Sequence, residues 1–115
     1  MELKKHVLVI AQINKSTFEF IRSGEKKIET RAGSPTYQNI KAGDILVFSC
    51  EGEEFEKNVS AMRHFASIAD LLKVYTPEQV NPETHSEDEL TRVYHSYPNY
   101  EEKIKEFGLL AFELE

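Results

Sequence analysis

The sequence predicts an α+β fold, a small mixed β-barrel flanked by about three helices, and three observations support this prediction. Short apolar runs with β-branched residues recur along the chain, and those in its middle are joined by connections of hairpin length. Three amphipathic segments with capping residues indicate helices. The length of 115 residues is typical of one domain with one hydrophobic core. We therefore expect residues 1–115 to form a single domain.

Five segments are expected to be strands, because each combines apolar or β-branched residues with neighbouring turn residues. They are residues 7–13, 27–31, 45–48, 55–65 and 107–114. Successive side chains of a strand point to opposite sides of the sheet. In the second strand, Lys27, Glu29 and Arg31 would therefore share one face. Ile28 and Thr30 would share the other face.

Three segments are expected to be helices. The first begins at Asn14 or Ser16, and Glu19 is placed to complete a capping box with Ser16. Gly24 ends it, because glycine readily takes a positive φ after a helix. The second covers residues 67–74 and starts with a capping serine. The third begins near residue 86 with acidic residues in its first turn, and it stops before Pro98.

The formal net charge of −6 limits the kind of nucleic acid that this chain would bind. Proteins that follow the phosphates of a long duplex are usually basic. No extended duplex DNA binding is therefore expected. A small pocket for a nucleotide, or for a short single-stranded stretch, is compatible with the charge.

Cysteine content and hydropathy indicate a cytoplasmic protein with no membrane segment. Cys50 is the single cysteine, so no internal disulfide can form, which favours a reducing compartment. No apolar run approaches the roughly 20 residues that span a bilayer. The four histidines are far apart, and the chain has no Gly-rich phosphate loop. We therefore expect no metal site and no cofactor.

A compact group of charged residues, Lys26, Lys27, Glu29 and Arg31, is open to two interpretations. It can be the solvated face of a strand, where ion pairs contribute little, and composition alone favours this interpretation. Alternatively, it lies in a cleft, where Glu29 and Arg31 form a buried, hydrogen-bonded couple. Arg31 could then hold a phosphate or carboxylate through two hydrogen bonds.

Tyrosines near the end of the third helix are the other candidate group. Tyr94, Tyr97 and Tyr100 could stack on a base. Three-residue spacing is, however, also typical of the half-buried face of a helix, and we consider this the commoner case.

Two motifs resemble the signature of the ASCH domain family, which is related to PUA domains, small β-barrels that bind RNA. The first is Phe18-x-x-Ile21-x-Ser23-Gly24-x-Lys26-Lys27-Ile28-Glu29-x-Arg31, and the second is Ile40-x-x-Gly43-Asp44-x-Leu46-x-Phe48. The resemblance extends from about residue 7 to residue 114. It implies a PUA-like barrel with a cleft beside the strand that carries Lys26, Glu29 and Arg31. It also implies a role with RNA or modified nucleosides.

A weaker resemblance is to the amidohydrolase branch of that family, which removes the acetyl group of N4-acetylcytidine. Its proposed machinery is a lysine, a threonine three residues later and a distant glutamate. Lys26 matches the lysine, whereas Glu29 stands at the threonine position and Thr30 lies one residue further on. Glu83 aligns with the distant acid if one gap is allowed. The candidate catalytic residues are therefore Lys26, Glu29 and Glu83, with Glu29 at most a general base on water.

The leading functional hypothesis is binding of RNA or a nucleotide-like ligand. Lys26 and Arg31 would contact a phosphate or carbonyl oxygen, and Glu29 would orient Arg31 or accept from a base amino group. Tyr94 or Tyr97 would stack from the rim of the cleft. The alternative is a hydrolase acting on a modified nucleoside such as N4-acetylcytidine. A third, weaker hypothesis is an adaptor whose acidic surface binds another protein. The identity of the ligand and the oligomeric state stay open.

Overall fold

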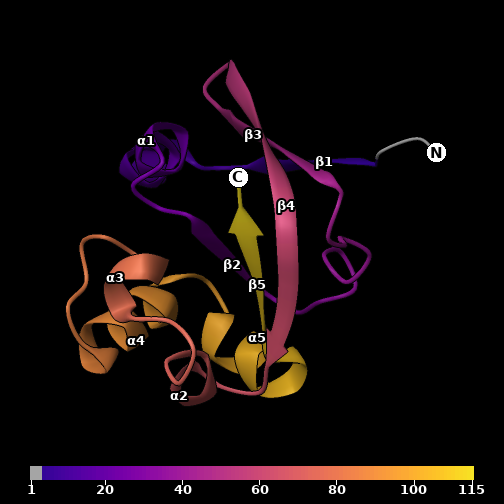
Figure 1. Ribbon diagram of the computed structural model, residues 1–115. Coiled ribbons are helices and arrows are strands. Elements are labelled where there is room, and N and C mark those ends of the chain that lie inside the picture. Colours follow the sequence, from indigo (N-terminus) through magenta and orange to yellow (C-terminus); the bar gives the residue numbers. More distant parts are fainter. Residues whose placement is uncertain (1–3) are drawn as a thin grey trace.

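A curled mixed sheet organises the chain in the computed structural model, which describes residues 4–115 (Figure 1). Its five strands are β1 (Lys5–Val9), β2 (Ile28–Ala32), β3 (Ile45–Cys50), β4 (Glu53–Phe65) and β5 (Leu109–Leu114). Their order across the sheet is β1-β3-β4-β5-β2. The pair β1 and β3 is parallel, and the other pairs are antiparallel. The predicted α+β, barrel-like fold is confirmed as a half-barrel whose open edges are β1 and β2.

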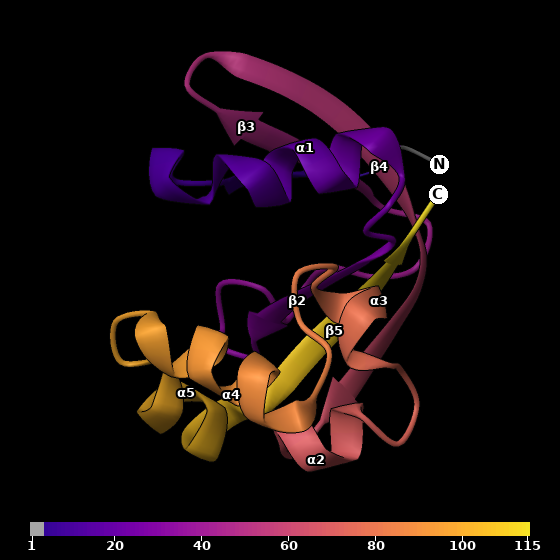
Figure 2. The ribbon, with the colours of Figure 1, turned by 90° about the vertical axis from the view of Figure 1, so that its left-hand side faces the viewer.

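The long strand β4 makes the curl possible. Its first half pairs with β3 and its second half pairs with β5, with a register shift between Val59 and Ala61. Such a bulge bends a strand and increases its twist. The sheet therefore curls, and Figure 2 shows β3 and β4 bending over α1 while β2 and β5 lie nearer the helices α2 to α5. Val9 at the end of β1 lines the same cavity as Thr30 and Arg31 of β2.

The helices are α1 (Lys15–Ser23), α2 (Ile68–Leu71), α3 (Pro77–Val80), α4 (Glu87–Ser96) and α5 (Tyr100–Phe107), with a short 3-10 helix η1 (Gln12–Asn14) before α1. The three predicted helices are present, and Gly24 follows α1 at φ 89° as expected. The prediction of Ser16 as a cap is wrong, because Asn14 is the N-cap and makes no side-chain bond there. The helices α3 and α5 were not predicted.

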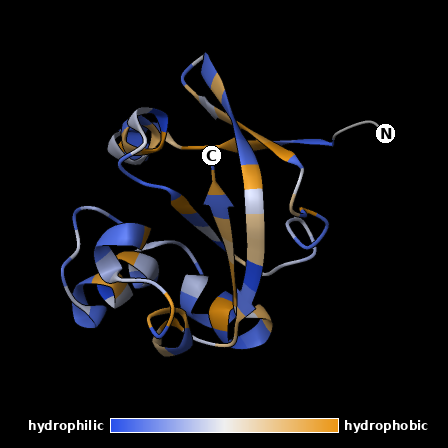
Figure 3. Cartoon of the chain, in the orientation of Figure 1, coloured by the Kyte–Doolittle hydropathy of each residue, from blue (hydrophilic) through white to orange (hydrophobic). Residues whose placement is uncertain are grey.

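Two hydrophobic clusters hold the layers together. One fills the concave side of the half-barrel under α1 and includes Phe18, Phe48 and Phe112. The other lies between the sheet and the helices α2 to α5 and includes Leu71 and Leu90. Figure 3 shows hydrophobic stretches in the middle of β4, and hydrophobic and hydrophilic stretches that alternate along the helices. None of the helices in residues 4–115 is long and apolar enough to cross a membrane.

Candidate functional site

The charged group that the sequence singled out lies on the edge strand β2 and in the two residues before it, and most of that group is buried. Lys26 and Glu29 are each only 5% exposed, and the Arg31 side chain is 18% exposed. The solvated-face interpretation, which composition favoured, is therefore wrong for these three residues. Lys27, by contrast, is exposed.

Glu29 forms the centre of a buried ionic bridge. Its Oε1 atom lies 3.5 Å from Nζ of Lys26, and its Oε2 atom lies 3.4 Å from Nη2 of Arg31. The backbone N–H of Thr30 donates to Oε1 at 2.9 Å. The guanidinium of Arg31 also lies over the ring of Tyr37, 5.6 Å from its centre. These contacts hold the guanidinium of Arg31 in one orientation.

The amine of Lys26 is engaged by the chain itself. It donates to the backbone carbonyls of Ile28 and Val80 and faces the Glu29 carboxylate. Three acceptors for one amine favour the ammonium form. Burial lowers the pKa of Lys26, and the neighbouring carboxylate opposes that shift. Lys26 therefore joins α3 to β2, and it adds positive charge to the site with no donor left over for a ligand.

The electrostatic state of Glu29 follows from its two cationic neighbours. Burial alone would raise the pKa of the carboxyl group. The charges of Lys26 and Arg31, together with the Thr30 N–H, hold that pKa below its ordinary value of 4.5. Glu29 is therefore ionised in the folded protein at neutral pH, and it neutralises one of the two cations.

The lowered pKa of Glu29 predicts how acid destabilises the fold. Since the unfolded chain binds the proton first, the stabilisation by Glu29 is complete above about pH 4.5 and is lost as the pH falls through the folded pKa. Chemical denaturation at stepped pH values should show the wild type losing stability more steeply than Glu29→Gln. Parallel pH profiles for the two proteins would contradict the assignment.

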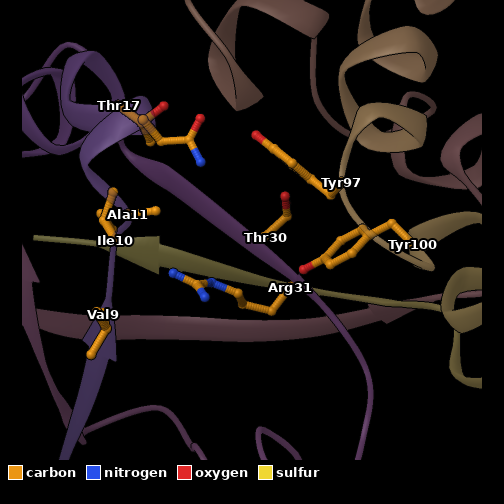
Figure 4. Close-up of a pocket in the computed structure, with 9 residues that line it drawn as sticks. Val9, Ile10, Ala11, Thr17, Thr30, Arg31, Tyr97 and Tyr100 are labelled. Carbon is orange, nitrogen blue, oxygen red and sulfur yellow. The ribbon is translucent and has the colours of Figure 1, made fainter.

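Two adjoining cavities form a cleft between β2, the β1–α1 connection and the helices α4 and α5, and Figure 4 shows the residues that line the larger one. The larger has a volume of about 220 Å³ and includes Arg31, and the smaller has about 50 Å³ and includes Lys26. Thr17, Thr30 and Tyr97 line both cavities. In Figure 4, Arg31 extends along the floor of the cleft towards the β1 side, opposite Tyr97.

The tyrosines take different positions from those expected. Tyr97 lines both cavities, and Tyr100 lines the larger one. Tyr94 is only 4% exposed and bonds its hydroxyl to the Thr30 side chain, so its predicted place on the rim is wrong. Its ring lies parallel to that of Tyr100, with centres 6.2 Å apart. Tyr94 therefore lines only the smaller cavity, where its hydroxyl is already engaged by Thr30.

Tyr100 was considered with Tyr94 and Tyr97 as a possible stacking residue, but the leading hypothesis named only the other two. It continues the three-residue spacing of the tyrosines beyond Pro98, and it opens α5. Its hydroxyl accepts a hydrogen bond from the N–H of Ala32 at 3.3 Å. Asn14 and Thr17 also line the cleft from the side of α1, and nothing in the sequence pattern distinguished them.

Glu83, the third candidate catalytic residue, lies outside the cleft. It is exposed in the turn after α3, where its N–H donates to the side chain of Asn81 at 2.9 Å. It lines neither cavity. Within residues 4–115, no group of three His, Cys, Asp or Glu side chains is arranged to hold a metal ion.

Two of the solved structures that are similar to this chain match over almost the whole length of both chains. The crystal structure of hypothetical protein PH0355 has 32% sequence identity and a TM-score of 0.83, and the match covers 96% of this chain and 97% of that chain. The solution NMR structure of protein PF0455 from Pyrococcus furiosus has 31% identity and a TM-score of 0.74, with 96% of each chain covered. No protein-family model and no curated protein matches the chain.

Proposed function

The chain belongs to the same protein family as PH0355 and PF0455, and we propose that it is an ASCH-type, PUA-like domain that binds an RNA- or nucleotide-like ligand in the cleft along β2. The ligand lies between Arg31 on the floor and Tyr97 and Tyr100 on the wall. Arg31 donates to a phosphate or carbonyl oxygen, and a tyrosine ring stacks on the base.

The observation that carries this proposal is the buried bridge beneath Arg31. Glu29 fixes the guanidinium at 3.4 Å, and the group lines a cavity beside two tyrosines. Arginine donates several N–H groups in one plane, which suits phosphate and carbonyl oxygens. Tyrosine rings accept any base by stacking. A pre-oriented arginine beside aromatic rings therefore supports a ligand that combines an anion or carbonyl with a flat ring.

The size of the cleft supports one nucleotide unit as the bound element. The cavities of about 220 and 50 Å³ are smaller than the roughly 300 Å³ at which pockets for drug-sized ligands begin. Lys26, Glu29 and Arg31 together contribute one net positive charge in a protein of net charge −6. This balance suits a single phosphate and disfavours a long phosphate backbone.

Replacing Arg31 with glutamine tests the proposal. In NMR titrations with AMP, IMP, CMP and UMP, the wild type should bind at least one nucleotide, with shifts concentrated on β2, Tyr97 and Tyr100. Arg31→Gln should weaken that binding by about tenfold or more, because a hydrogen bond to a charged group contributes roughly 1.5–3 kcal/mol.

Arg63 provides a matched control for this substitution. It is also an arginine on a strand paired with a glutamate, with 3.1 Å between its Nε and Oε2 of Glu113, but it lies outside the cleft. Arg63→Gln should leave the affinity unchanged. The proposal fails if none of the four nucleotides binds, or if both arginine variants lose affinity equally.

The hydrolase alternative has weaker support from the geometry. Lys26 and Glu29 are in contact, but Glu83 lies outside the cleft and the Lys26 amine is occupied by three acceptors. Release of acetate from N4-acetylcytidine, added as a further ligand in the same titration, would favour that alternative over simple binding.

A further inference from the structure

The open edge of β2 forms part of the cleft, and the register of the sheet determines which of its backbone groups face outward. The carbonyl of Lys27 accepts a hydrogen bond from the N–H of Leu114 on β5 at 2.8 Å. Bonded and non-bonded pairs alternate along an antiparallel ladder. The N–H and C=O groups of Ile28, Thr30 and Ala32 therefore point away from β5, towards the open edge.

At the start of this edge, charged side chains form hydrogen bonds with the backbone N–H and C=O groups that point outward. Lys26 donates to the carbonyl of Ile28, and the N–H of Thr30 donates to Glu29 at 2.9 Å. The same lysine also donates to the carbonyl of Val80, the last residue of α3. Helix α3 therefore covers this end of the edge.

At the other end, helix α5 and the loop after β2 form hydrogen bonds with the outward-pointing backbone groups of Ala32. The N–H of Ala32 donates to the hydroxyl of Tyr100 at 3.3 Å. The carbonyl of Ala32 accepts from the N–H of Ser34 at 2.8 Å. This end of the edge is therefore also closed to a further strand.

The carbonyl of Thr30 lies between these two covered ends. No donor within residues 4–115 forms a hydrogen bond with it. Thr30 lines both cavities, and it is flanked by Lys26 in one and by Tyr100 in the other. A backbone carbonyl at such a place retains its full capacity to accept. The groups that close the rest of the edge therefore leave one outward-pointing acceptor, on a residue that lines both cavities.

We infer that the carbonyl oxygen of Thr30 accepts a hydrogen bond from an exocyclic amino group of the ligand base, so that the cleft selects adenine and cytosine over hypoxanthine and uracil. This inference rests on the proposed nucleotide binding. The oxygens of Glu29 are already engaged by Lys26, Thr30 N–H and Arg31, so along β2 these contacts leave the Thr30 carbonyl open as an acceptor.

The neighbouring arginine strengthens this preference. Arg31 only donates, and it follows the Thr30 carbonyl directly along the strand. Adenine and cytosine offer an amino donor beside a ring-nitrogen acceptor, whereas uracil offers a carbonyl acceptor in place of the amino group. An oxo group facing the Thr30 carbonyl would place two acceptors together. Sites built around such a hydrogen bond reject the analogue that lacks it.

Two pairs of nucleotides test the inference, because each pair differs by an amino group against an oxo group. In titrations of the wild-type protein, AMP should bind at least about tenfold more tightly than IMP, and CMP at least about tenfold more tightly than UMP. The carbonyl-carbon NMR shift of Thr30 should change on binding AMP. The corresponding shift of Ala32, whose carbonyl is already bonded to Ser34, serves as the control and should change little.

The outcomes separate the inference from the proposed function. Equal affinity within the pairs, or tighter binding of IMP and UMP, would overturn the inference and leave nucleotide binding intact. An amino preference without a change at Thr30 would also overturn it, because another acceptor would then be responsible. Binding of none of the four nucleotides would reject the proposed function and the inference with it.

Discussion

Replacing Glu29 with alanine is expected to lower the free energy of unfolding by about 3–5 kcal/mol, since removing one partner of a buried ionic network leaves the others uncompensated. Lys26 and Arg31 would stay in the interior without their shared counter-charge. The N–H of Thr30 would lose its acceptor as well. Equilibrium denaturation with urea, followed by circular dichroism at neutral pH, measures the loss.

Glu53 is the matched control for this experiment. Its carboxylate also bridges two cations, with Oε2 3.4 Å from Nζ of Lys15 and Oε1 3.1 Å from Nη2 of Arg22, but its side chain is 48% exposed. Solvent screens such pairs, so Glu53→Ala should have a much smaller effect. A loss below about 1 kcal/mol for Glu29→Ala would mean that its bridge contributes no more than a surface salt bridge.

The strand β2 illustrates how far local pattern predicts this site. Alternation along residues 27–31 correctly placed Glu29 and Arg31 on one face, since side-chain direction in a strand depends only on position. Burial of that face was not predictable from the segment itself. The groups that cover its edge, Val80 and Tyr100, are supplied from about 50 and 70 residues further along the chain.

The two helices that were missed have local causes. In α3, Pro77 occupies the first turn of a four-residue helix with Thr76 as its cap, whereas proline in a polar segment usually indicates a loop. Asn99 precedes α5 at φ 61°, a conformation that gives little signal in the sequence. Because α5 carries Tyr100, missing it also removed one wall of the cleft from the predicted site.

The residues that cover the edge of β2 also form part of the proposed ligand site. An open edge strand invites pairing with another chain. Lys26, Glu29 and Tyr100 prevent this by occupying backbone groups that a new strand would need. Since Glu29 also orients Arg31, the protection of the edge and the orientation of the proposed ligand contact are coupled. A variant that weakens the bridge should therefore affect both stability and binding.

The junction between α5 and β5 depends on Gly108. This residue has φ 73° and ψ −162°, a region that side chains avoid. A Cβ atom there would lie 2.3 Å from the carbonyl oxygen of Phe65 and 2.7 Å from Nε2 of His64. Both neighbours are held in place, because Phe65 pairs with Leu109 in the sheet and His64 bonds to the carbonyl of Phe107 at 2.8 Å.

Gly108→Ala is therefore expected to destabilise the protein by about 2–6 kcal/mol, combining roughly 1–3 kcal/mol of backbone strain with a similar cost of overpacking. Gly43→Ala separates the two contributions, since Gly43 has φ 95° but open space around the position of its Cβ atom. Thermal or urea denaturation should show Gly108→Ala as clearly the more damaging. Equal losses would mean that the contact with Phe65 relaxes at no cost, and that backbone strain alone makes glycine necessary between α5 and β5.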